Sequence, residues 1–150
     1  MAHVDERPAE DPELAVLLKA AFDELVVRNG AEGRTQVKDG ARYFVALDDE
    51  GQAVGCGALQ VFGPGTAHPG DAEIKRVYVT PAARGRGHAR RLLAQVEAAA
   101  RSAGHPFLRL STAERQPEAI ALYESSGYAR IAPWGKYVNE PRTRCYGKAL

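Results

Sequence analysis

The run IKRVYVTPAARGRGHARRLL, Ile74 to Leu93, constrains the fold more than any other stretch of this sequence. It begins with an apolar segment of strand character and ends in a segment whose apolar residues recur at helical spacing. Polar residues fall mostly on the opposite side of that helix. Its apolar positions are Ala89, Leu92, Leu93, Val96, Ala99, Ala100 and Ala103. The run therefore predicts a strand joined by a short loop to an amphipathic helix, which Gly104 ends.

The loop in this run concentrates positive charge and glycine where the helix begins. A helix N-terminus presents unpaired backbone N–H groups and about half a unit of positive charge. Gly85 and Gly87 lack side chains, so a ligand oxygen can approach several amides, and Arg84 and Arg86 add charge beside them. This combination is typical of a phosphate or pyrophosphate site.

Two common phosphate-binding motifs do not fit this loop. The P-loop requires Gly-Lys-Ser/Thr at the helix start, but His88 and Ala89 follow the second glycine. The dinucleotide-binding fingerprint requires a third glycine, which GRGHAR lacks, and an acidic residue after a second strand. Both classes of site are therefore excluded.

The rest of the chain carries alternating helix and strand signals. Apolar residues at helical spacing predict a helix from Asp11 and Pro12 to Asn29 and Gly30. Strands are expected at 42–48, 52–62, 72–80, 107–112, 128–131 and 143–150, and a further helix at 116–126. The imperfect alternation within 72–80 is consistent with a β-bulge. With 150 residues, the pattern predicts a single domain, 1–150, of mixed α/β class in which helices cover a sheet.

Two motifs carry a resemblance to a known family. Arg84-x-x-Gly87-x-Ala89 follows the strand VYVTP, and the later segment AIALYESSGY spans Ala119 to Tyr128. In these residues the chain resembles the GNAT superfamily of acetyl-CoA-dependent N-acetyltransferases, and the resemblance extends over residues 11–150. It implies a central mixed, mostly antiparallel sheet flanked by helices, with two central strands splayed apart.

The resemblance implies acetyl-CoA as co-substrate. Backbone amides of the loop would grip the pyrophosphate, and the backbone of the preceding strand would hydrogen-bond the pantetheine arm as an added strand. Gln116 stands where relatives often have asparagine, and its amide would bind pantetheine. The cofactor-binding residues expected on this basis are Val77, Tyr78, Val79, Arg84, Gly85, Arg86, Gly87, His88, Ala89 and Gln116.

Acyl transfer to an amine also requires a base. A lysine-like amine is only about 0.1% neutral near pH 7.4, and a positioned carboxylate can accept its proton, directly or through water. Glu73, at the head of the central strand, is the candidate, although it could instead be a strand-end carboxylate paired with Lys75 or Arg76. Asp71 and Glu114 are weaker candidates. Relatives often carry a glutamate in the next strand, where this chain has Ser111.

The leaving thiolate requires a proton as well. Tyr123 lies where the family places a tyrosine whose hydroxyl approaches the cofactor sulfur, although a tyrosine at this helical position is also typical of an amphipathic core. The family further implies that a backbone N–H on the central strand, that of Val79, polarises the thioester carbonyl.

The acceptor is expected to be a primary amine of a small molecule or peptide. Three segments are expected to border its site: residues 30–40, the loop around His68, and the tail 132–142, which carries Trp134 and Tyr137. The tail could instead be a loop that its aromatic residues hold in place. Dimers are common among relatives, which leaves a homodimer open.

Composition and charge argue against other classes. A formal net charge of +1 does not favour nucleic acid, and no apolar run is long enough to span a bilayer. The start of the chain lacks an apolar export segment, so the cytoplasm is the expected location. The four histidines suggest no metal site, and Cys56 and Cys145 are expected to be core residues. Two alternatives remain: a catalytically silent acyl-CoA-binding sensor, and a nucleic-acid-binding module that uses RGRGHARR.

Overall fold

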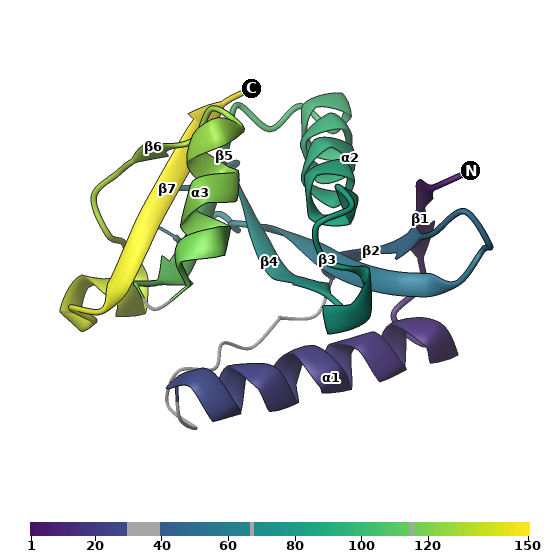
Figure 1. Ribbon diagram of the computed structural model, residues 1–150. Helices are drawn as coiled ribbons and strands as arrows, with labels where there is room; N and C mark the ends of the chain where they lie inside the picture. The colour runs from purple at the N-terminus through teal and green to yellow at the C-terminus, as the bar shows by residue number, and fades with distance from the viewer. Residues whose placement is uncertain (30–39, 67, 115) are drawn as a thin grey trace.

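Seven strands form one sheet in the computed structural model, which describes residues 1–29, 40–66, 68–114 and 116–150 (Figure 1). The strands are β1 (His3–Arg7), β2 (Arg42–Leu47), β3 (Ala53–Val61), β4 (Ala72–Val79), β5 (Phe107–Ala113), β6 (Ala129–Arg130) and β7 (Thr143–Ala149), and the helices are α1 (Pro12–Asn29), α2 (His88–Ser102) and α3 (Pro117–Ser125). The strand order is β1-β2-β3-β4-β5-β7-β6, and every neighbouring pair is antiparallel except β4 with β5. The predicted mixed α/β fold with a mostly antiparallel sheet is confirmed.

Helices cover both faces of this sheet (Figure 1). Leu14 and Leu17 of α1 pack with Cys56 on one face, and Leu92 of α2 and Tyr123 of α3 belong to the core on the other. Burial of each leucine side chain contributes about 1.5–3 kcal/mol of hydrophobic stabilisation. The central strands are therefore fixed between two apolar layers.

A β-bulge interrupts β4 at Arg76. Cys56 pairs with Tyr78, but Ala58 pairs with Lys75, so two residues of β4 lie opposite Gly57 of β3. Arg76 has φ 59°, the left-handed region that a residue with a side chain rarely adopts. This bulge accounts for the imperfect alternation of the sequence, because the side-chain alternation after it is shifted by one residue.

The two central strands separate soon after they meet. The parallel pairing of β4 with β5 is limited to Ala72 with Leu108 and Glu73 with Arg109. Beyond these pairs, the edge of β4 that faces β5 has no strand partner in the part of the chain that the structure describes. The splayed central strands implied by the resemblance are therefore present.

The sequence pattern did not predict β1. The segment HVDER is mostly polar, and among its residues Val4 packs against the α2-side core. Glu6 accepts two hydrogen bonds of 2.8 Å from Arg42 of the neighbouring strand. Charged pairs of this kind suit the edge of a sheet, where alternation of apolar residues is not required.

Cys56 and Cys145 are free and buried, at 0% and 2% exposure, as expected for core residues. Burial raises the pKa of the Cys56 thiol to about 12, which makes it unreactive.

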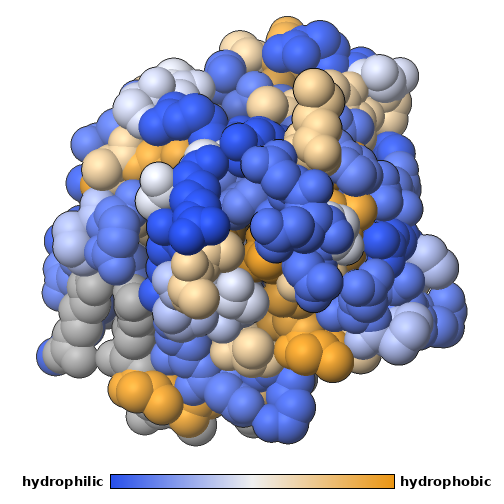
Figure 2. All heavy atoms as spheres, turned by 45° about the vertical axis from the view of Figure 1, so that its right-hand side comes forward, coloured by the Kyte–Doolittle hydropathy of each residue, from blue (hydrophilic) through white to orange (hydrophobic). Residues whose placement is uncertain are grey.

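Hydrophilic residues cover most of the face seen in Figure 2. None of the helices in the described residues combines the length and the apolar character needed to cross a membrane.

Candidate active site

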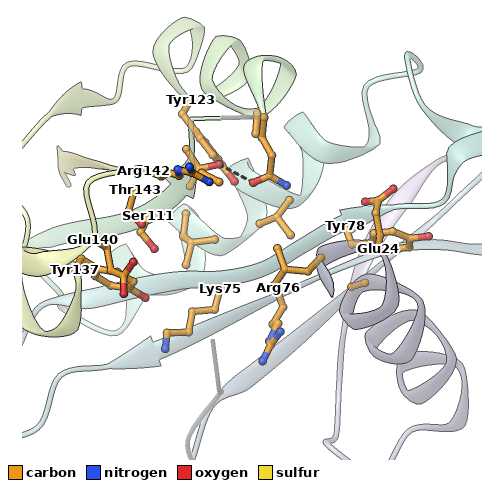
Figure 3. A pocket seen from close by; sticks show the side chains of 18 residues that line it. Glu24, Lys75, Arg76, Tyr78, Ser111, Tyr123, Tyr137, Glu140, Arg142 and Thr143 are labelled. Atoms are coloured by element: carbon orange, nitrogen blue, oxygen red, sulfur yellow. Dashed lines mark hydrogen bonds between the residues drawn. The ribbon is translucent and has the colours of Figure 1, made fainter. Parts of the chain in front are cut away.

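A cavity of about 400 Å³ lies where β4 and β5 separate (Figure 3). Its walls come from β4, β5, α1, α3 and the segment that leads into β7. The residues that line it are Ala21, Glu24, Leu25, Ile74, Lys75, Arg76, Val77, Tyr78, Ser111, Thr112, Ala113, Gln116, Ala119, Tyr123, Tyr137, Glu140, Arg142 and Thr143. The cavity thus occupies the gap that an extended ligand would fill beside β4.

Three of the predicted cofactor residues, Val77, Tyr78 and Gln116, line this cavity. The Gln116 side-chain oxygen accepts a hydrogen bond of 3.0 Å from the Thr112 hydroxyl, which fixes the amide at the start of α3. The amide nitrogen of Gln116 remains available as a donor.

Val79 does not line the cavity, but its amide is directed toward the gap. The next residue, Thr80, donates its N–H to the Val54 carbonyl of β3 at 2.8 Å. Because successive amides of a strand point to opposite edges, the Val79 N–H points away from β3 and toward β5. No described residue accepts a hydrogen bond from it.

The loop before α2 presents a series of free amides. In the described part of the chain, no group accepts a hydrogen bond from the backbone N–H groups of residues 85–89, and α2 has no side-chain cap. Gly85 and Gly87 have φ of 80° and 86°, which glycine adopts without strain. Consecutive amides in such a conformation form a concave anion-binding surface. The amides of Gly85, Arg86, Gly87, His88 and Ala89 therefore fit a diphosphate.

Arg91 fixes the shape of this loop, a role that sequence reasoning missed. Both of its terminal nitrogens donate to the Arg86 carbonyl at 3.2 Å, and one lies 3.4 Å from Nδ1 of His88. The His88 side chain is 5% exposed, so His88 can reach a ligand mainly through its backbone. The arginines of the run HARRLL could have suggested such a contact, since Arg91 lies one helical turn after Gly87.

Arg84 is placed differently from its expected role beside the phosphate. Its Nε donates to the Val79 carbonyl at 2.8 Å, and its Nη2 lies 2.6 Å from Oε1 of Glu24 in α1. Its backbone N–H already donates to the Pro81 carbonyl at 3.3 Å. Arg84 therefore ties the end of β4 to α1, whereas Arg86 forms no ion pair with the described residues.

Tyr123 extends from α3 into the cavity (Figure 3). Its ring packs edge-on against Tyr128 at 6.1 Å, and no described residue hydrogen-bonds its hydroxyl. Burial raises the pKa of Tyr123 to about 12. The hydroxyl is thus protonated at neutral pH and free to donate to a ligand.

Glu73 lies behind the cavity wall. It is 4% exposed and does not line the cavity, but its carboxylate contacts two residues that do. The Tyr137 hydroxyl donates to Oε2 at 3.4 Å, and Nζ of Lys75 lies 3.8 Å from Oε1. Glu73 therefore forms an ion pair with Lys75, which was the alternative to a role as base. A proton could reach this carboxylate from the cavity only through a bridging group.

The weaker candidates for the base are held elsewhere. Asp71 accepts from Nε of Arg109 at 2.9 Å, and Glu114 from Nη2 of Arg144 at 2.7 Å. Neither carboxylate lines the cavity. Ser111 does line it, and hydrogen bonding links its hydroxyl to Tyr137.

The segments expected to border the acceptor site divide between the cavity and its surroundings. Tyr137 lines the cavity, whereas Trp134 packs against Phe62 and Tyr137 at ring distances of 6.2 and 5.2 Å. Nδ1 of His68 lies 3.1 Å from Arg109. Residues 30–39 lie outside the described residues.

Five charged residues of the cavity were not predicted individually as site residues: Glu24, Lys75, Arg76, Glu140 and Arg142. Glu24 belongs to the polar positions of α1, for which local sequence patterns give no signal, whereas Glu140 and Arg142 lie in the tail that was expected to border the acceptor site. Among the residues the structure describes, no group of three or more histidine, cysteine, aspartate or glutamate side chains could hold a metal ion.

Comparisons with known proteins agree with this arrangement. Residues 6–128 match the acetyltransferase (GNAT) family. The IAA acetyltransferase of Azospirillum brasilense is 41% identical over 117 residues, which are 78% of this chain and 73% of that protein.

Solved structures show the same fold. A Klebsiella pneumoniae protein assigned as an acyl-CoA N-acyltransferase superimposes with a TM-score of 0.81 at 30% identity, covering 100% of this chain and 98% of that one. The ribosomal-protein-alanine N-acetyltransferase of Brucella melitensis gives a TM-score of 0.73 at 25% identity, with coverage of 97% and 99%. The resemblance carried by the two sequence motifs is confirmed, and the chain belongs to the GNAT family of acetyltransferases.

Proposed function

We propose that the protein transfers the acetyl group of acetyl-CoA directly to a primary amine of a small molecule or peptide. The observation that carries this proposal is the row of free amides from Gly85 to Ala89. These amides follow the unpaired edge of β4, so one extended ligand can contact both. Each charge-assisted hydrogen bond from such an amide to a phosphate contributes about 1.5–3 kcal/mol. Several of them are sufficient to anchor the diphosphate, while the edge of β4 holds the extended pantetheine arm.

Residues around the cavity supply the remaining chemistry. The Val79 N–H stabilises negative charge on the thioester oxygen when the amine nitrogen attacks the carbonyl carbon. The C–S bond then breaks, and the Tyr123 hydroxyl gives its proton to the sulfur. The nitrogen loses one proton to Glu73 through water, since the carboxylate lies behind Lys75 and Tyr137.

Calorimetry with acetyl-CoA is the first test, followed by a screen of amines for release of the free thiol. We expect saturable binding of one acetyl-CoA per chain and thiol release that depends on an amine. Absence of acetyl-CoA binding would contradict the proposal. Binding without turnover on any amine would favour the silent acyl-CoA-binding sensor instead.

Replacing Glu73 with glutamine is expected to lower kcat/KM by about a hundredfold near pH 7, because the amine must then lose its proton without a base. The deficit is expected to shrink as pH rises toward the pKa of the amine, where the nucleophile is already neutral. The measurement is the pH profile of thiol release for both proteins. Asp71→Asn is the matched control, since that carboxylate is paired with Arg109 away from the cavity. A Glu73→Gln enzyme with the wild-type profile would remove Glu73 from the mechanism.

Arg84 and Arg86 are expected to differ in what they stabilise. Arg84→Ala loses the bonds to Val79 and Glu24, so we expect its free energy of unfolding to fall by about 1–2 kcal/mol. Arg86 is exposed, and Arg86→Ala is expected to weaken acetyl-CoA binding about three- to tenfold with little change in stability. Urea unfolding and calorimetry on both variants measure the two effects. A larger loss of affinity in Arg84→Ala would mean that its guanidinium turns to the phosphate.

A further inference from the structure

Arg76 occupies an unusual position in the candidate active site. Its guanidinium is half-buried, and the described residues provide no ion pair or hydrogen bond to it. Burial lowers the pKa of Arg76, with only the hydroxyls of Tyr43 and Tyr137 and the thiol of Cys56 acting in the opposite direction. An arginine held in this way, without a carboxylate, leaves part of the cost of removing a charge from water uncompensated.

The other charges at the cavity are distributed differently. Glu24 forms an ion pair with Arg84, with Oε1 2.6 Å from Nη2. Nζ of Lys75 lies 3.8 Å from Oε1 of Glu73. Glu140 lines the cavity from the segment before β7 and is exposed. Among the cavity charges that the structure describes, the half-buried cation without a carboxylate partner is therefore Arg76.

The direction of the Arg76 side chain separates it from the cofactor elements. In Figure 3, Lys75 and Arg76 point from β4 to the side opposite Tyr123. Arg76 also lines a second cavity of about 370 Å³, whose other walls are Leu18, Lys19, Phe22 and Tyr43. The guanidinium thus lies where the gap between β4 and β5 meets a partly apolar recess against α1.

The backbone explains why the side chain is held there. Arg76 is the bulged residue of β4 with φ 59°, so its side chain leaves the strand in a direction that regular alternation does not allow. A left-handed conformation of this kind costs an arginine about 1–2 kcal/mol and persists only where the surroundings fix it. The bulge therefore orients Arg76 and the thioester-binding edge of β4 together.

We infer that the acceptor amine carries a carboxylate, which Arg76 binds while the amino group reaches the thioester through the gap. This inference rests on the proposed function and specifies its substrate class. Arginine binds a carboxylate through two parallel N–H bonds, which would fix both position and orientation of the acceptor. The recess lined by Phe22 and Tyr43 accommodates an apolar body on the same molecule.

Paired acceptors test the inference: phenylalanine with phenylalaninamide, and alanine with alaninamide. Thiol release is measured for the wild type and for Arg76→Gln, and the quantity compared is the ratio of kcat/KM for acid over amide. We expect the wild-type ratio for at least one pair to exceed that of Arg76→Gln by about ten- to a hundredfold. Comparing the ratio between the two proteins cancels the different basicities of acid and amide.

Two further variants locate the effect. Arg142→Gln removes the cation that lines the cavity from the segment before β7, and Arg101→Gln removes an exposed cation near the end of α2. Both are expected to keep the wild-type ratio. The inference would be overturned if the acid-to-amide ratio of kcat/KM fell in Arg142→Gln but not in Arg76→Gln. Equal ratios in all four proteins would overturn it as well.

Failure of the inference and failure of the proposed function give different results. If acetyl-CoA binds and neutral amines are acetylated while neither amino acid is, the carboxylate is not part of the acceptor and the inference is wrong. If acetyl-CoA itself does not bind, the proposed function fails first, and the inference falls with it.

Discussion

Gly87→Glu is expected to weaken acetyl-CoA binding at least about a hundredfold while the protein still folds. The substitution places a negative side chain where the amides of the loop would meet the diphosphate, and removes the space that glycine leaves there. Losing two charge-assisted hydrogen bonds of about 1.5–3 kcal/mol each gives an effect of this size. Calorimetry with acetyl-CoA measures the affinity, and circular dichroism with thermal unfolding establishes that the fold is intact.

Gly104→Glu provides the matched control for this experiment. Gly104 has φ 86°, the same value as Gly87, but it lies after the other end of α2, and a Cβ there would meet nothing within 4 Å. Both variants therefore carry the same backbone strain of about 1–2 kcal/mol and the same added charge. Only Gly87→Glu is expected to lose affinity. Wild-type affinity in Gly87→Glu, or equal losses in both variants, would contradict a diphosphate site at the start of α2.

Tyr123→Phe is expected to lower kcat by about 10²- to 10⁴-fold, which is the usual contribution of a positioned general acid. Acetyl-CoA affinity is expected to stay within about twofold of wild type, since the ring and its packing against Tyr128 remain. With a pKa of about 12, the hydroxyl stays protonated over the whole neutral range, so the loss is expected to be similar from pH 6 to 9. Single-turnover thiol release and calorimetry measure the two quantities.

Tyr128→Phe tests whether any buried tyrosine of this cluster has the same effect. The Tyr128 hydroxyl donates to Oε1 of Glu97 at 2.8 Å. The other carboxylate oxygen of Glu97, Oε2, accepts a hydrogen bond from Nζ of Lys148 at 3.1 Å. We expect Tyr128→Phe to lose about 1–3 kcal/mol of stability and to keep its turnover. Wild-type turnover in Tyr123→Phe on a genuine acceptor would remove Tyr123 from the reaction. Equal losses in both variants would assign the effect to packing.

Local patterns in the sequence were sufficient to predict most of the fold. The strand before Arg84 and the helix from His88 carry clear periodicity. The glycines at 85 and 87 indicate a loop whose backbone amides are accessible to a ligand. The first strand was missed because HVDER owes its place to pairing with β2 rather than to its own apolar character. Local pattern cannot report a pairing partner that is separated by nearly forty residues.

The site was less predictable because it depends on contacts between distant segments. The Arg84 side chain turns to Glu24, a partner in a helix that no motif connects to the loop. Glu73 has the expected place in its strand, but Tyr137 and Lys75 stand between it and the cavity. The orientation of Arg76 follows from its left-handed backbone conformation. The irregular alternation in the sequence indicates that a bulge is present, but not which way the bulged side chain points.

The short parallel contact between β4 and β5 has a consequence for the cooperativity of the protein. In the described residues, β4 and β5 pair only at Ala72–Leu108 and Glu73–Arg109. The β1–β4 and β5–β7 parts of the sheet therefore share few backbone hydrogen bonds there. Under the proposed function, pantetheine completes the ladder along β4, so the co-substrate acts as a missing piece of secondary structure. By mass action, acetyl-CoA at a hundred times its Kd would then add about 2.7 kcal/mol to global stability. Under the proposed function, the stability of the folded protein would therefore depend on the supply of its acyl donor.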